Sequence, residues 1–285
     1  MAPHLVGPRR LPLAAAPARC RLPHRADRGG GRQPEEEDGH GSRHLFLHPT
    51  IRALHHVRRH RTSPPSASRS LIVAMPTTPG VDGRLAYVSG EAELLRQLLP
   101  NPALLIEPDG LAGGVASHES EARPTKARVL EQLSDCGIVH FACHGAHDPL
   151  DPSQSLLLLH DHERDPLNVA SIAQVRMDSA QLAYLSACRT AFMDSVELID
   201  EAIHLTSAFQ LAGFPHVIGT LWEVDDKEAS RMTVDFYAEL GAAADMYRNV
   251  DMGAIARALH KTVRDIRDQF PGTPYLWAAH LHAGL

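Results

Sequence analysis

Short, fully apolar runs recur along the chain from residue 71 onward, and segments with helical spacing separate them. The runs lie at Leu71–Met75, Ala103–Ile106, Ile138–Ala142, Leu182–Leu185 and His216–Leu221. A strand that is apolar on both faces is typical of a parallel sheet covered by helices on each side. The alternation therefore predicts an α/β fold, a three-layer sandwich with a mainly parallel central sheet.

The segments between these runs predict the covering helices. They lie at Ser89–Leu99, Pro124–Leu133, Val169–Val175, Asp200–Ala212, Asp225–Leu240 and Gly253–Phe270. In the first helix we expect Ser89 as the N-cap, and an apolar face made of Leu94, Leu95, Leu98 and Leu99. Ser155–Leu159 is a further apolar run, and Tyr275–His282 is expected to close the sheet as an edge strand.

The N-terminal part of the chain differs from the rest. Residues 1–47 are rich in Arg, Pro, Gly and His and show no sustained period, so they cannot bury enough apolar surface to offset their ordering entropy. We expect this segment to be disordered, or to be an anomalous reading of the gene. Residues 48–70 predict a short helix and a Pro/Ser-rich linker. The folded domain is expected at 71–285.

Composition excludes several classes of protein. The formal net charge of −6 and the pI of about 6.3 give no basic footprint for nucleic acid. No apolar run reaches the roughly 20 residues that a membrane span needs. The four cysteines match neither a zinc-finger pattern nor a disulfide framework, and no phosphate-binding loop or dinucleotide fingerprint is present. The sequence therefore predicts a cytoplasmic protein without a membrane span or a nucleotide cofactor.

Reactive side chains directly follow two of the apolar runs. Cys143-His144-Gly145 follows Ile138–Ala142, and Ser186-Ala187-Cys188 follows Leu182–Leu185. In open α/β sheets, reactive groups gather at the carboxyl ends of the strands. The pattern thus predicts that His144 and Cys188, 44 residues apart, meet at one edge of the sheet.

A thiol and an imidazole in this position suit covalent catalysis. The thiolate of Cys188 is a good nucleophile, and histidine can remove its proton and later protonate the leaving group near neutral pH. The backbone N–H groups of Gly145 and Cys188 are candidates for an oxyanion hole, where one donor is typically worth roughly 3–4 kcal/mol in the transition state.

Three segments, in order, resemble a known family. VHFACHGAHDPLDPSQSLLLL, LAYLSACRTA and HLTSAFQLAGFPHVIGTLWEVDD are similar to the CHAT domain of the caspase, separase and gingipain group of cysteine peptidases. The resemblance covers about residues 71–285 and implies a sandwich of caspase type. It also implies that His144 and Cys188 form a dyad that hydrolyses peptide bonds in a protein or peptide substrate, without a metal or organic cofactor.

Four residues near these motifs are candidates for substrate binding: Asp148, Arg189, Trp222 and Asp225. Many CHAT domains have an acid where this chain has Arg189, so the resemblance argues against a preference for a basic residue before the scissile bond (P1). Asp148 is equally well explained as a turn residue, Trp222 as a core residue, and Asp225 as the N-cap of the following helix.

Other interpretations of the same residues stay open at this stage. Two groups suggest a metal site, namely Cys143, His144 and His147, and His160, Asp161, His162 and Glu163. Neither has the spacing of a structural zinc site, so we predict no metal. Cys136 and Cys143 are expected to be structural. The main alternative function is a catalytically inactive domain that docks a regulatory signalling partner, and a truncated product without a stable fold is a weaker third.

Overall fold

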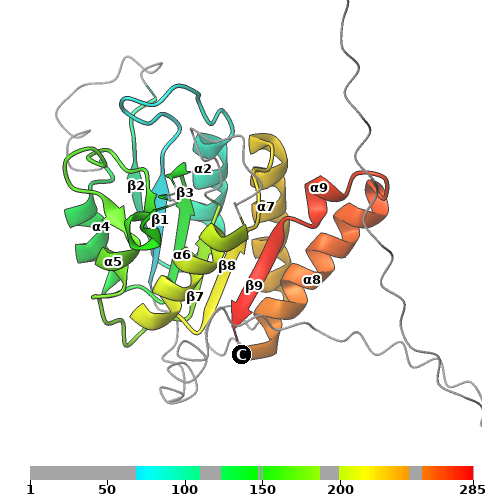
Figure 1. The fold of residues 1–285 in the computed structure, drawn as a ribbon. Coiled ribbons are helices and arrows are strands. Elements are labelled where there is room, and N and C mark those ends of the chain that lie inside the picture. Colours follow the sequence, from blue (N-terminus) through cyan, green and yellow to red (C-terminus); the bar gives the residue numbers. More distant parts are fainter. Residues whose placement is uncertain are drawn as a thin grey trace, which may run out of the picture. The chain divides into compact units, whose positions relative to one another are not determined.

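A six-stranded sheet forms the centre of the fold (Figure 1). The computed structural model describes residues 69–109, 123–146, 148, 150–186, 199–243 and 252–284. The strands of this sheet are β1 (Ser70–Ala74), β2 (Pro102–Ile106), β3 (Ile138–Ala142), β7 (Leu182–Leu185), β8 (His216–Thr220) and β9 (His280–Gly284). Their order is β2-β1-β3-β7-β8-β9, and every neighbouring pair is parallel except β8 with β9. The predicted α/β fold with a mainly parallel sheet is confirmed.

Helices cover both faces of the sheet, because successive strand residues point to opposite sides. On β3, Val139 and Phe141 join one apolar core, while Ile138 and Ala142 join the other. The first core is covered by α4 (Lys126–Leu133), α5 (Val169–Ile172) and α6 (Ile199–Ala212). The second is covered by α2 (Val88–Leu98), α7 (Asp226–Ala243) and α8 (Met252–Gln269). These layers make the three-layer sandwich (Figure 1).

The start and the buried face of α2 differ from the prediction. The N-cap is Tyr87 rather than Ser89, which lies inside the first turn. The Tyr87 backbone N–H donates to the carboxylate of Asp226, the first residue of α7, at 2.9 Å. A residue distant in sequence therefore holds the start of α2, and no local side chain caps it. Leu94 was also assigned to the apolar face wrongly, since it is 46% exposed, while Glu91 is buried.

The C-terminal segment was also predicted only in part. A short helix, α9 (Pro274–Trp277), occupies the first half of the predicted strand Tyr275–His282, and the edge strand β9 begins at His280. Pro274 suits the first turn of a helix, because an N–H group at that position would have no partner within the helix and proline lacks one. The Trp277 indole then donates to the Phe270 carbonyl at 3.1 Å, which ties α9 to the end of α8.

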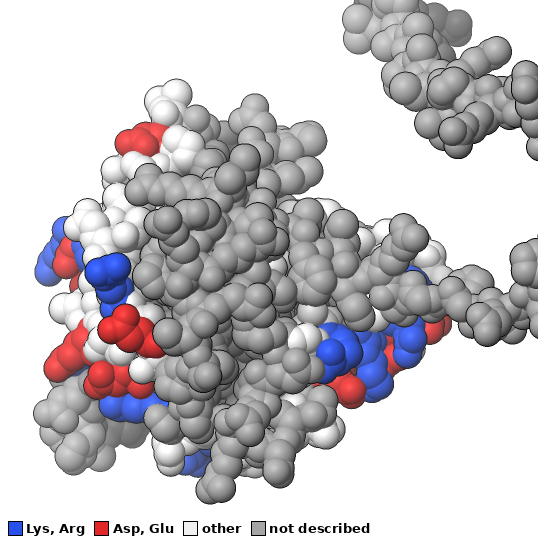
Figure 2. All heavy atoms as spheres, turned by 90° about the horizontal axis from the view of Figure 1, so that it is seen from below, with Lys and Arg blue, Asp and Glu red and all other residues white. Residues whose placement is uncertain are grey.

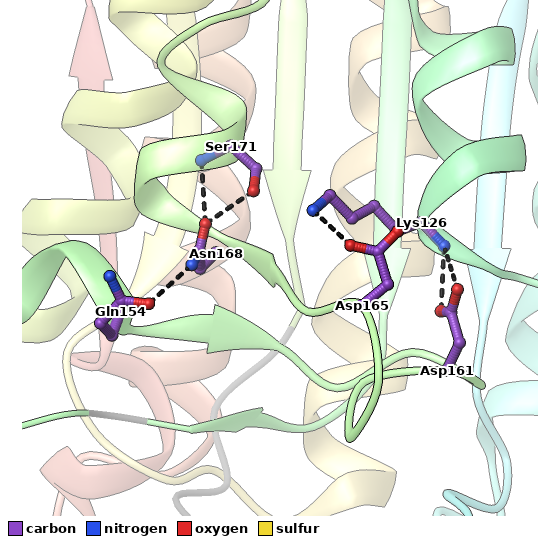
Figure 3. Close-up of polar contacts among 6 residues, drawn as sticks. All are labelled: Lys126, Gln154, Asp161, Asp165, Asn168 and Ser171. Atoms are coloured by element: carbon purple, nitrogen blue, oxygen red, sulfur yellow. Dashed lines mark hydrogen bonds and ion pairs between the residues drawn. The ribbon is translucent and has the colours of Figure 1, made fainter.

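A small antiparallel sheet follows β3 in the chain. It consists of β4 (Gly145–Ala146), β5 (Leu156–Leu157) and β6 (Leu167–Asn168), with the 3₁₀ helix η1 (Pro152–Gln154) between β4 and β5. Figure 3 shows how side chains hold it. Asp161 accepts from the Lys126 backbone N–H at 3.0 Å, and the Lys126 ammonium pairs with Asp165 at 2.7 Å. Asn168 caps α5 by accepting from the Ser171 N–H at 2.9 Å. The contacts of Asp161 and Asp165 with Lys126 hold the segment between β5 and β6 against the start of α4.

Charges are mixed on the surface rather than separated by sign. Figure 2 shows basic and acidic side chains interspersed among the described residues on one face. On α8, Lys261 pairs with Glu239 of α7 at 2.6 Å and with Asp265 at 3.5 Å. None of the helices in the described ranges is long and apolar enough to cross a bilayer. The predicted segment 1–47 and the predicted helix near 51–57 lie outside the described residues.

Candidate functional site

The carboxyl ends of β3, β7 and β8 meet at one edge of the central sheet. The pairing brings His140 beside Tyr184 and Tyr184 beside Ile218, so these parallel strands end at similar heights. Cys143 and His144 follow β3, Ser186 follows β7, and the segment 221–225 connects β8 to α7. The prediction placed the reactive groups at this edge.

A cavity of about 200 Å³ opens at this edge. Four parts of the chain line it: the loop and first turns of α2, the end of β3, the end of β7, and the end of β8 with the start of α7. The lining residues are Arg84, Leu85, Val88, Glu91, Cys143, His144, Ser186, Thr220, Glu223, Val224, Asp225, Asp226 and Ala229.

His144 lies on the cavity wall and is 1% exposed. Its backbone is fixed on the side of the small sheet, because the His144 carbonyl accepts from the Leu158 N–H at 2.8 Å and Gly145 pairs with Leu157. The Ser186 N–H donates to the Phe141 carbonyl at 2.8 Å, which keeps the chain after β7 alongside β3. The chain therefore leaves β7 at Ser186 beside the end of β3.

The predicted site residues are distributed as follows. His144 and Asp225 line the cavity, and Gly145 is buried directly after His144. Cys188 and Arg189 lie outside the described residues.

The two other substrate-binding candidates do not line the cavity. The Asp148 carboxylate accepts from the N–H groups of Leu150 and Asp151 at 2.9 and 3.0 Å, which is a turn contact. The Trp222 indole donates to the Tyr275 carbonyl at 3.0 Å, so it joins the end of β8 to α9.

Among the described residues that line the cavity, carboxylates outnumber the basic side chains. Glu91, Glu223, Asp225 and Asp226 all line it. Burial raises the pKa of Asp226, although its hydrogen bond from the Tyr87 N–H opposes this. Asp225 accepts from the Lys227 N–H at 3.0 Å, as an N-cap of α7 does. Two of the four carboxylates thus also organise helix starts.

Glu91 was not identified from the sequence. Its side chain is 2% exposed, and its Oε1 lies 2.8 Å from Nε2 of His140 on β3. The His140 ring is enclosed by Tyr184 and Tyr237, with ring centroids 5.1 and 5.8 Å away. Glu91 stands three residues after Val88 and four before Leu95, both of which are buried. A glutamate within such an apolar stripe was the signal that could have identified it.

The remaining cysteines differ in their surroundings. Cys136 is buried with its Sγ 3.1 Å from the Gln132 carbonyl, and burial raises the pKa of its thiol to about 11. It is therefore a poor nucleophile. Cys143 is buried and contributes to the cavity wall. Within the described ranges, no three His, Cys, Asp or Glu side chains gather as a metal site would require.

Comparison with known proteins identifies the family. A search of curated proteins found no match. Saccharomyces cerevisiae separase, solved in complex with securin, is similar with a TM-score of 0.49 and 15% identity over 85% of this chain and 14% of the separase chain. The Arg-specific cysteine proteinase gingipain R gives a TM-score of 0.48 and 10% identity over 81% of this chain and 50% of its own. This chain thus spans half or less of either structure. The family model of the CHAT domain matches residues 23–285, which is most of the sequence, and the chain therefore belongs to the CHAT domain family.

Proposed function

We propose that this chain is a cysteine peptidase in which His144 and Cys188 form the catalytic dyad. The observation that carries the proposal is the position of His144 on the cavity wall with Ser186 on the same wall. Cys188 follows Ser186 by two residues. Because consecutive Cα atoms lie about 3.8 Å apart, this leaves at most about 7.6 Å between the Cα atoms of Ser186 and Cys188.

The proposed reaction proceeds through an acyl-enzyme. His144 takes the thiol proton, and the thiolate of Cys188 attacks the scissile carbonyl carbon. The C–N bond breaks as His144 gives the proton to the leaving amine. Water then attacks the thioester with His144 as the base, which releases the acid and restores the thiol. Backbone N–H groups of Gly145 and Cys188 would hold the oxyanion in both steps.

The size of the cavity suits one substrate side chain. An apolar cavity of about 150 Å³ holds a benzene molecule, and drug-sized ligands occupy roughly 300–1,000 Å³. At about 200 Å³, this cavity matches a single large side chain of a peptide. We assign it to the P1 residue, which precedes the scissile bond, because His144 lies on its wall.

The cellular setting follows from the same proposal. We infer that the peptidase acts in the cytoplasm on a protein substrate, with a signalling partner that controls it. The small number of cysteines in the sequence fits a reducing compartment.

Covalent labelling tests the proposed function. The folded protein is treated with acyloxymethyl ketone peptides bearing Arg, Lys, Asp or Leu at P1, and the adduct is measured by intact mass and mapped by peptide digestion. We expect one adduct on Cys188 that disappears in Cys188→Ala and His144→Ala. Cys136→Ala is the matched control and should keep the adduct.

Two outcomes would contradict the dyad. An adduct on Cys143 that survives Cys188→Ala would move the nucleophile to the other strand end. No adduct from any probe, with a cooperative unfolding transition showing that the protein is folded, would favour a catalytically inactive interaction domain.

A further inference from the structure

We propose that Glu107 and His160 are positioning residues for the peptidase, because their side-chain pair fixes the segment that holds the backbone of His144. This inference rests on the proposed function, since it takes His144 as the general base. Neither Glu107 nor His160 lines the cavity. The pair therefore acts on the reaction through His144 and not through contact with the substrate.

A short series of contacts leads from the pair to His144. The His144 carbonyl accepts from the Leu158 N–H at 2.8 Å. His160 follows Leu158 by two residues, and its Nδ1 lies 3.0 Å from Oε2 of Glu107. Because two consecutive steps of the backbone span at most about 7.6 Å between Cα atoms, the place of His160 limits where Leu158 can lie. The position of the His144 carbonyl depends on Leu158 in turn.

Glu107 offers a fixed point for this contact. It directly follows β2, and its backbone N–H donates to the Ala74 carbonyl of β1 at 2.9 Å, so its main chain continues the pairing of the central sheet. His160 is also held through its own main chain, because its backbone N–H donates to the Pro124 carbonyl at 3.0 Å, just before α4. The side chain of His160 thus faces the end of β2, while its backbone is held at the start of α4.

Energetics favour a positioning role for the pair over a stabilising one. The side chains of Glu107 and His160 are 10% and 28% exposed. Removing a carboxylate from water is costly, and replacing such a pair by apolar residues often leaves stability unchanged. Leu157 and Leu159, on either side of Leu158, already join the apolar core. What the pair adds to this burial is direction, because a hydrogen bond requires one arrangement of donor and acceptor.

The experiment measures the labelling of Cys188 by the acyloxymethyl ketone that reacts fastest in the panel above. The limiting rate constant at saturating probe and the binding constant of the probe (KI) are determined separately. We expect Glu107→Ala to lower the limiting rate constant about tenfold or more and to leave KI nearly unchanged, because the cavity lining is intact. His160→Leu should have the same effect. His160→Asn carries an amide donor near the place of Nδ1 and should keep most of the rate.

Two further variants separate positioning from stability. The double variant Glu107→Leu/His160→Leu should unfold in urea much as wild type does and still label slowly; labelling at the wild-type rate constant would overturn the inference. Asp165→Asn is the matched control, because it breaks the exposed pair with Lys126 that joins the same segment to α4 (Figure 3). It should keep the limiting rate constant within about twofold. An equal fall in Asp165→Asn would show that any loosening of the segment slows the reaction, and would also overturn the inference.

Hydrogen exchange separates this inference from the proposed function. Exchange of the Leu158 amide is measured by NMR in Cys188→Ala and again after adding Glu107→Ala or Asp165→Asn. Faster exchange at Leu158 with Glu107→Ala, and not with Asp165→Asn, would support the positioning of His144 even if no probe labelled Cys188, in which case the proposed function would fail alone. A wild-type limiting rate constant in Glu107→Ala, together with unchanged exchange at Leu158, would overturn the inference and leave the peptidase intact.

Discussion

Acid should destabilise the edge of the sheet through His216. This residue lies on β8, is 2% exposed, and stacks on His282 of β9 with Nδ1 3.0 Å from Nε2 of that ring. Burial lowers the pKa of His216 to about 3, and the neighbouring His282 contributes to the decrease. The folded protein therefore holds His216 neutral at pH values where an unfolded histidine takes up a proton.

The magnitude follows from the two pKa values. Above the unfolded pKa of about 6.5, His216 is neutral in both states and does not make stability depend on pH. Below it, the unfolded chain binds a proton that the folded protein does not, so the free energy of unfolding falls by about 1.4 kcal/mol per pH unit. The loss reaches about 2.7 kcal/mol at pH 4.5 and stops near pH 3. This is a large part of the 5–15 kcal/mol that stabilises a typical domain.

Urea unfolding at pH 7.5, 6.5, 5.5 and 4.5 measures this effect. Carboxylates also titrate in the acid range, so the quantity of interest is the difference in free energy of unfolding between wild type and His216→Asn. We expect the free energy of unfolding of wild type minus that of His216→Asn to fall by about 1.4 kcal/mol per pH unit below pH 6.5. His260→Asn, which removes an exposed histidine of α8, is the control and should follow wild type. A difference that stays constant from pH 6.5 to pH 4.5 would refute the reasoning.

Two further predictions concern the core and a tight turn. Phe209 is fully buried between the rings of Phe141 and Phe214, at 5.5 and 5.7 Å, so Phe209→Ala should lower the free energy of unfolding by about 3–5 kcal/mol in urea; Leu94→Ala on the exposed face of α2 should change it by less than about 0.5 kcal/mol. Gly213 ends α6 with φ +127°, and an added Cβ would clash with the Met177 carbonyl, so Gly213→Ala should cost about 1–3 kcal/mol or more and lower the Tm. A stability equal to wild type in Phe209→Ala or Gly213→Ala would contradict the packing described.

The strands could be predicted because their signal is local. Ile138–Ala142 and Leu182–Leu185 match β3 and β7 residue for residue, since both faces of each strand are buried and every position must be apolar or paired. The start of α2 could not be predicted in this way. The N–H of its N-cap residue, Tyr87, donates to Asp226, 139 residues away in sequence, and a local sequence pattern cannot reveal a partner at that distance.

The position of His144 at a strand end was also predictable, because a residue that directly follows an apolar strand of a parallel sheet lies at the carboxyl edge of that sheet. The composition of the cavity wall was not. Its carboxylates come from α2 and from the β8–α7 connection, which the sequence pattern does not relate to each other. Only the structure shows that these carboxylates share one cavity. Asp225 alone was considered from the sequence, both as a substrate-binding residue and as the N-cap of the following helix.

Glu91 shows how a buried carboxylate that needs a partner can be identified from the sequence pattern alone. Val88, Ala92 and Leu95 define one face of α2, and Glu91 occupies the same face. A lone carboxylate there would be costly to bury, so it requires either a polar partner or access to a ligand. His140 is likewise a polar residue inside an otherwise apolar strand, so its ring also needs a polar partner. Two such exceptions in facing elements predict each other as partners, and the structure pairs them, with Oε1 of Glu91 2.8 Å from Nε2 of His140.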